Sequence, residues 1–115
     1  MDYDNPLTSK QKIGILLPIL LTNRNLLFPP PFNEEDFYRR LFSKSRIKPT
    51  TMRSLVRFIV RMEAKHVQIT DEHVISAVAN ILLRSATHAE KSAYKILSDR
   101  VNEKIKNRRQ SVISS

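Results

Sequence analysis

The sequence predicts an all-α fold, a compact bundle of about five helices with an extended proline-rich strap after the first. Three observations support this fold class. The 115 residues include a single glycine, whereas β-hairpins and phosphate-binding loops need glycine where the backbone takes a positive φ. Apolar residues recur at helical spacing along most of the chain. Helix-capping residues precede most of these periodic segments.

One globular domain is expected, because 115 residues with a hydrophobic fraction of 41% are enough for one core and too few for two. Residues 1 to 8 are polar and lack periodicity, which predicts a flexible tail, and residues 110 to 115 are expected to form another. The helical domain is therefore predicted to span residues 9 to 109.

The first helix is expected from Ser9 onward, and Gly14 and Pro18 predict that it is short or kinked. Its apolar stretch, residues 13 to 21, is much shorter than the roughly 20 residues of a membrane span. Acidic residues before it and no small-residue cleavage pattern after it argue against a secretory signal. Two roles stay open, a buried core helix or a surface strip that binds another subunit through Ile15, Leu16, Ile19 and Leu20.

Residues 25 to 32 are predicted to form the extended strap. Each of the three consecutive prolines disfavours helix in the residue before it, and together they favour polyproline II geometry. Phe28 and Phe32 flank the prolines. We favour a role for both rings as pins that fasten the strap to the domain; the alternative is an exposed recognition motif.

Two helices are predicted after the strap. Asn33 caps the first, whose first turn is acidic and whose far end carries Arg39 and Arg40, as the helix dipole favours. Pro49 and Thr50 mark the start of the next helix, predicted over about residues 51 to 65. Its apolar residues at helical spacing are Met52, Leu55, Val56, Ile59 and Met62.

Two more helices complete the bundle. Thr70 and Asp71 begin a helix that runs to about Ser85 and is apolar on nearly all sides, which predicts the central position. Residues 87 to 90 have the form of a capping box and begin the last helix, expected to end near Arg109. Its apolar seam repeats every four residues, at Ala89, Ala93, Leu97, Val101 and Ile105.

The formal net charge of +9 is unevenly distributed: the first 35 residues carry about −1 and the remainder about +10. This charge indicates an acidic partner. One basic cluster is a ridge roughly 18 Å long on one helix edge, formed by Arg53, Arg57, Arg61 and Lys65. The ridge is either a track for phosphates or acidic protein, or it is a solvated face, or it pairs with Glu63, Glu72 or Glu90 inside the domain. The second cluster ends the last helix, at Lys104, Lys106, Arg108 and Arg109.

The pattern of titratable residues points away from catalysis. There is no cysteine, and no two of the three histidines have the spacing of a helical zinc pair, so no metal site or cofactor is expected. Asp71 and Glu72 are adjacent and suit the first turn of a helix better than an acid/base pair. We therefore expect no enzyme activity and no small-molecule substrate.

Ser111 follows two arginines and a glutamine, a sequence pattern that basophilic kinases recognise, so it is a candidate phosphosite.

The segment Val67-Gln68-Ile69-Thr70-Asp71-Glu72-His73-Val74, continuing to Ser85, resembles the loop and third helix of histone-fold proteins, and is similar to small centromeric subunits of that family. That family has a central helix of about eight turns before this loop, whereas Pro49 limits the helix here to about half that length. Arg108-Arg109-Gln110 is similar to the Arg-Arg-Lys-Gln motif of peptides that bind histone-chaperone WD40 propellers, with the lysine absent. Both resemblances imply a chromatin setting.

The function expected from these patterns is that of an adaptor subunit in a nuclear, chromatin-associated complex, such as a centromere or histone-deposition assembly. It would bind partner proteins, among them a histone-chaperone WD40 protein, through the apolar N-terminal strip and the basic last helix. The alternative is direct binding of DNA or RNA through the basic helix faces. An accessory protein of a virus or phage is a third interpretation. No membrane association is expected.

Overall fold

The computed structural model describes the backbone of residues 7–42 and 49–114, and the side chains of residues 7–41 and 49–107. This part of the chain contains α-helices and one short 3-10 helix, with no strand, which confirms the all-α class. The elements in chain order are α1 (Ser9–Thr22), η1 (Arg24–Leu26), α2 (Glu34–Phe42), α3 (Met52–Lys65), α4 (Glu72–Ser85) and α5 (His88–Ser114).

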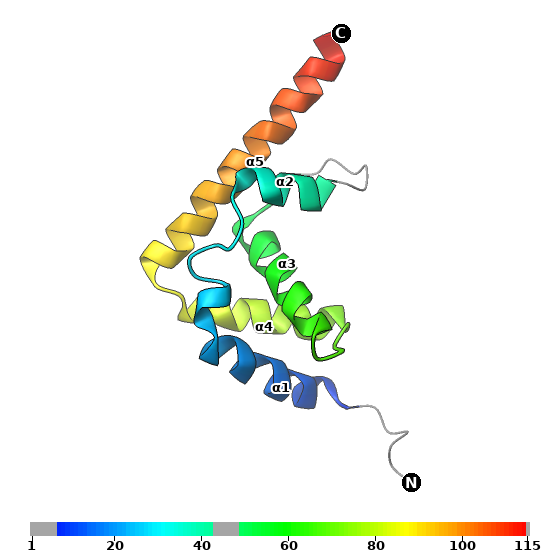
Figure 1. Ribbon diagram of the computed structural model, residues 1–115, viewed down its shortest axis with the longest axis vertical. Helices are drawn as coiled ribbons and strands as arrows, with labels where there is room; N and C mark the ends of the chain where they lie inside the picture. Colours follow the sequence, from blue (N-terminus) through cyan, green and yellow to red (C-terminus); the bar gives the residue numbers. More distant parts are fainter. Residues whose placement is uncertain (1–6, 43–48, 115) are drawn as a thin grey trace.

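Helix α4 is the central element of the lower half of the molecule, as its nearly all-round apolar pattern predicted. It packs against α1 on one side and α3 on the other. Helix α5 packs against α2 and α3, and its C-terminal end continues past α2, away from the other helices (Figure 1). The fold therefore has a helical body and one projecting helix end.

Local capping chemistry explains where the later helices begin. Asn33 Oδ1 accepts a hydrogen bond from Asp36 N at 2.9 Å, and Thr51 Oγ1 accepts one from Ser54 N at 3.1 Å. The predicted capping box before α5 is present, since Thr87 N donates to Glu90 Oε1 at 2.8 Å and Glu90 N donates to Thr87 Oγ1 at 3.1 Å. These helix starts are confirmed to within a residue.

The two ends of the helical chain differ from expectation. Helix α1 is one continuous helix of 14 residues with Pro18 inside it, capped by Thr8. Pro18 cannot bond to the Gly14 carbonyl, but both residues are exposed, so water can satisfy that carbonyl.

At the other end, α5 extends to Ser114. The prediction that the helix ends near Arg109 is therefore wrong, and residues 110–114 are helical. Most of the predicted first tail lies outside the described residues.

The proline-rich connection is fastened by its aromatic residues, as predicted, although it is not one extended strap. It begins with the 3-10 helix η1 and bends around the prolines. The Phe28 ring meets the Tyr94 ring edge-on at 5.7 Å, and the Phe32 ring meets Phe37 at 5.3 Å. Both phenylalanines therefore join this segment to the core.

The core is continuous through all five α-helices. Its largest fully buried side chains include Leu16 and Leu20 from α1, Phe37 from α2 and Tyr94 from α5. In α3 the buried face is shifted from the prediction: Val60 and Ala64 are buried, whereas Met52 and Met62 are only partly buried. A buried leucine or phenylalanine contributes about 1.5 to 3 kcal/mol, so this core is the main source of stability.

Candidate partner-binding surfaces

The predicted ridge on α3 lies on one helix edge, but its four cations have different surroundings. Arg61 forms a two-point ion pair with Glu72, in which Nη2 lies 2.6 Å from Oε1 and Nε 2.8 Å from Oε2. The hydrogen bond from Arg61 lowers the pKa of Glu72 and raises that of Arg61. Arg57 Nη1 lies 3.4 Å from Ser76 Oγ, and Arg53 and Lys65 are exposed. The ridge is therefore not one uninterrupted cationic track.

The basic end of α5 is also partly engaged within the domain. Lys104 Nζ lies 2.8 Å from Glu35 Oε2 and attaches α2 to α5. The hydrogen bond from Lys104 lowers the pKa of Glu35. Lys106 is exposed and has no partner among the described side chains. The side chains of Arg108, Arg109 and Ser111 lie outside the described residues, although their backbone belongs to the projecting end of α5.

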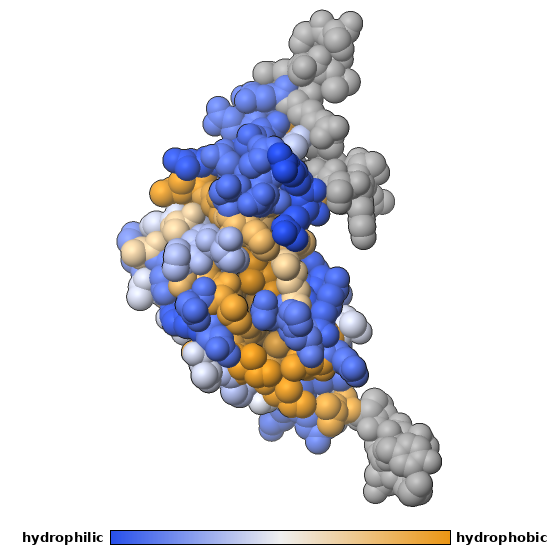
Figure 2. All heavy atoms as spheres, in the orientation of Figure 1, coloured by the Kyte–Doolittle hydropathy of each residue, from blue (hydrophilic) through white to orange (hydrophobic). Residues whose placement is uncertain are grey.

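The apolar N-terminal strip does not form one partner surface. Leu16 and Leu20 are fully buried against the core of the chain itself, so their prediction as partner-binding residues is wrong. Ile19 is partly buried, and Ile15 is 40% exposed. Figure 2 shows apolar side chains gathered over α1 and the helices beside it, while the surface over α2 and the adjoining part of α5 is hydrophilic.

A cavity of about 660 Å³ opens where the start of α3, the second half of α4 and the middle of α5 meet. Four cationic side chains line it, one from α3, one from α4 and two from α5: Arg53, Arg84, Lys91 and Lys95. Only Lys95 is paired, through an ion pair of 2.8 Å with Asp99. The other three have no hydrogen-bond or ion-pair partner within the described part of the chain. The cavity therefore collects uncompensated positive charge from three helices.

Uncharged polar and apolar side chains line most of the rest of the cavity. Asn102 binds both backbone groups of Thr50, accepting from Thr50 N at 2.7 Å and donating to Thr50 O at 2.9 Å. This pair fixes the start of α3 against α5. Asn80 Oδ1 is buried and accepts no hydrogen bond from the described residues. Met52 and Leu83 supply apolar surface. The arrangement suits an anionic group that also offers a hydrogen-bond donor.

The helical spacing predicted Arg53 at the start of the ridge, but it did not bring Arg53 together with Arg84. Lys91 and Lys95 were not singled out. Each helix contributes only one or two of these cations, so no periodicity within a single helix marks the cluster. The signal available was the concentration of basic residues beyond residue 35.

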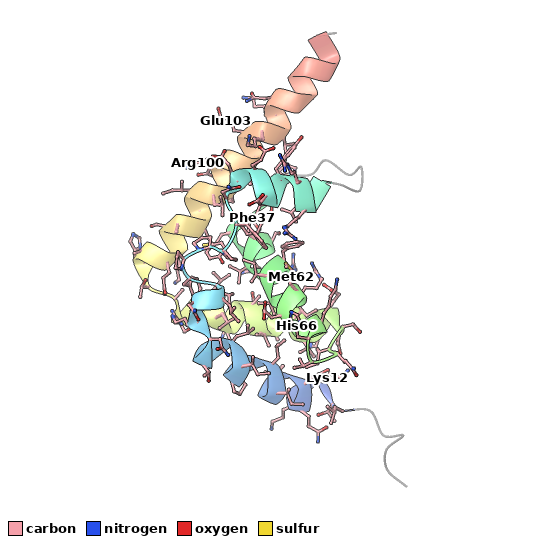
Figure 3. The ribbon with its side chains drawn as sticks, in the orientation of Figure 1. Lys12, Phe37, Met62, His66, Arg100 and Glu103 are labelled. Carbon is pink, nitrogen blue, oxygen red and sulfur yellow. The ribbon has the colours of Figure 1, made fainter. Side chains whose placement is uncertain are left out.

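The three histidines do not form a common site. His66 caps the end of α3 (Figure 3), His73 lies in the first turn of α4, and His88 begins α5. Within residues 7–41 and 49–107, no three histidine, aspartate or glutamate side chains are grouped so that they could hold a metal ion. None of the described helices combines the length and the apolar character needed to cross a bilayer.

Comparison of the chain with protein-family models, with curated proteins and with solved structures found no match.

Proposed function

We propose that this protein is a non-enzymatic adaptor that binds an acidic partner protein through the basic side chains of α3, α4 and α5 that line one cavity. The observation that carries this proposal is the group of three unpaired cations, Arg53, Arg84 and Lys91, around one cavity. Like charges held together repel one another unless an anion lies between them. A partner with carboxylates would supply that anion.

The proposal places the adaptor in a nuclear, chromatin-associated complex such as a centromere or histone-deposition assembly. Support for this setting comes from the two resemblances, to histone-fold subunits over residues 67 to 85 and to WD40-binding peptides at residues 108 to 110. The helix before the first of these segments has 14 residues, about half the eight turns of the histone-fold central helix. A histone-chaperone WD40 protein is one candidate partner for the basic end of α5.

Affinity purification of the tagged full chain from cells that express it tests this function. After nuclease treatment, the wild type is expected to retain protein partners with acidic surfaces. A double variant, Arg84→Glu with Lys91→Glu, should lose at least one of them, whereas Lys10→Glu with Lys65→Glu, which changes the net charge equally at two exposed positions elsewhere, should keep it. The adaptor function would be contradicted if the untreated sample contained nucleic acid and no protein partner remained after nuclease treatment.

Direct nucleic-acid binding is the second candidate, because the same unpaired cations would also bind phosphates. A mobility-shift titration against salt separates the two candidates. Three phosphate contacts predict a slope of roughly −3 for the logarithm of the binding constant against the logarithm of salt concentration. The double variant Arg84→Glu, Lys91→Glu should weaken binding and reduce that slope to roughly −1 if phosphates occupy the cavity, because only Arg53 remains. Absence of a shifted band at low salt would exclude this candidate.

A further inference from the structure

We infer that the cavity between α3, α4 and α5 binds a short peptide segment of the partner in which a carboxylate lies next to an apolar side chain. This inference rests on the proposed adaptor function and deepens it, since it names where the partner binds and what chemistry it presents. Four features of the cavity favour such a segment: its charge, the helix end beside it, its unused acceptor and its shape.

The cavity brings three unpaired cations together, whereas unpaired cations elsewhere in the described part of the chain, such as Lys10, Lys65 and Lys106, lie on separate helices. Elsewhere the described cations commonly lie beside a carboxylate, as in the pairs Lys12 with Asp71, Arg24 with Glu90, Arg39 with Glu35, Arg61 with Glu72, Arg100 with Glu34 and Lys104 with Glu35. At the cavity, Asp99 is the single acidic lining residue, and Lys95 already engages it. The domain therefore leaves Arg53, Arg84 and Lys91 for an anion that it does not supply itself.

The start of α3 adds to the same field. Thr51, Met52 and Arg53 line the cavity, so the positive end of the α3 dipole lies there. Helices α2, α4 and α5 each carry acidic residues in their first turn, whereas α1 and α3 have none. Together with the three unpaired cations, this helix end favours a carboxylate in the cavity.

The unused acceptor distinguishes a peptide from a simple anion. Asn80 lines the cavity, and its Oδ1 is buried without a donor in the described part of the chain, so a small rotation of the amide would let a ligand N–H satisfy it. A carboxylate or an unprotonated phosphate only accepts hydrogen bonds, but a peptide backbone offers N–H groups at regular spacing. Met52 and Leu83 provide the apolar contact for a neighbouring side chain.

The shape and lining of the cavity favour a peptide over nucleic acid. A volume of about 660 Å³ lies within the range of roughly 300 to 1,000 Å³ typical of small-ligand clefts and cavities, so it suits a short segment. No aromatic side chain lines the cavity, and binding of single strands relies on aromatic stacking platforms. The Asn102 and Thr50 pair holds the start of α3 against α5, so these two walls of the site are already formed.

Fluorescence anisotropy tests the inference with a fluorescein-labelled peptide of about ten residues, in which aspartates and glutamates flank one leucine. The controls are the same peptide with lysines in place of the acids, the same peptide with serine in place of leucine, and a labelled oligothymidine of equal length. The wild type should bind the acidic leucine peptide more tightly than any of the three. The double variant Arg84→Glu, Lys91→Glu should weaken that binding about tenfold or more, and Lys10→Glu, Lys65→Glu by no more than about twofold.

A second measurement guards against a folding defect in the variant. In ¹H–¹⁵N spectra of the wild type, the acidic peptide should shift the side-chain amide signals of Asn80 and Asn102 before those of other asparagines. Equal binding by both double variants, tighter binding of oligothymidine, or peptide shifts confined to other surfaces would overturn the inference. If the peptide fails while Arg84→Glu, Lys91→Glu still loses a protein partner that the wild type retains, only the inference of a carboxylate beside an apolar side chain falls. If no protein co-purifies with the wild type, the adaptor function falls as well.

Discussion

The guanidinium group of Arg61 binds both carboxylate oxygens of Glu72, at 2.6 and 2.8 Å, and so joins α3 to the first turn of α4. Glu72 is therefore held both by a cation and by the positive end of the α4 dipole. One of the four cations of the basic ridge therefore connects two helices of the same domain and is not available to a partner. Of the other three, Arg53 lies at the cavity, at the opposite end of α3.

Replacing Glu72 with glutamine tests the contribution of this pair to stability. The Glu72 side chain is 60% exposed, so Glu72→Gln should lower the free energy of unfolding by only about 0.5 kcal/mol. Urea denaturation monitored by circular dichroism measures the change. Glu63→Gln is a matched control, because Glu63 lies on α3 and has no partner among the described residues. An equal loss in both variants would show that the ion pair itself contributes nothing.

The starts of the later helices could be predicted because capping is local chemistry. Asn33 bonds to a backbone group three residues away, and the Thr87 to Glu90 box closes within the same distance. Contacts between distant residues were not predictable. Arg24 pairs with Glu90 across 66 positions, and Tyr94 bonds to Leu27 across 67. Helical periodicity tells which side of a helix is apolar, but not which other helix it meets.

The candidate site also depends on contacts between distant residues, which the sequence did not predict. The sequence placed Arg53 on a cationic helix edge, but it could not show that Arg84 and Lys91 converge on that residue from two other helices. Hydrophobicity likewise could not separate the α1 residues that meet the core of the chain from those left exposed. Leu16 is fully buried and its neighbour Ile15 is 40% exposed, because adjacent helical residues point about 100° apart.

The hydrogen bond from Tyr94 Oη to the Leu27 carbonyl, 2.5 Å long and buried, should stabilise the fold measurably. Burial also raises the pKa of the Tyr94 hydroxyl, which keeps it protonated and able to donate. Tyr94→Phe should lower the free energy of unfolding by about 1 to 2 kcal/mol, since it leaves a buried carbonyl unpaired. Tyr94→Leu also removes the edge contact with Phe28 and should lower it by about 2 to 4 kcal/mol. Chemical denaturation gives both values, and a phenylalanine variant as stable as the wild type would refute the role of the hydroxyl.

The two faces of α1 should respond differently to truncation. Leu16→Ala should lower the free energy of unfolding by about 2 to 5 kcal/mol, because the leucine is fully buried and its removal leaves a cavity. Ile15→Ala should lower it by less than about 1 kcal/mol, because that side chain is 40% exposed. Thermal denaturation of both variants checks the difference. Similar losses would mean that Ile15 packs in the core, contrary to its exposure here.

Three glutamates should make stability depend on acid pH. The pKa values of Glu35, Glu72 and Glu90 lie below their ordinary value of 4.5, chiefly because each carboxylate accepts a hydrogen bond from a cationic side chain: Lys104, Arg61 and Arg24, respectively. A carboxylate with a depressed pKa in the folded state stabilises the fold fully above its unfolded pKa. That stabilisation is lost as the pH falls through the folded value.

The melting temperature should therefore decline below about pH 4.5, while these three groups contribute no pH dependence between about pH 6 and 8. Lys104→Met removes the principal partner of Glu35 and brings the pKa of that carboxyl closer to its ordinary value. The variant should thus be less stable than the wild type at neutral pH but should lose less on acidification. Differential scanning calorimetry across this pH range measures both effects. If the melting temperatures of the two proteins fell equally with decreasing pH, the Lys104 to Glu35 pair would not contribute to acid sensitivity. Only a change in proton uptake between the folded and unfolded states alters the dependence of stability on pH.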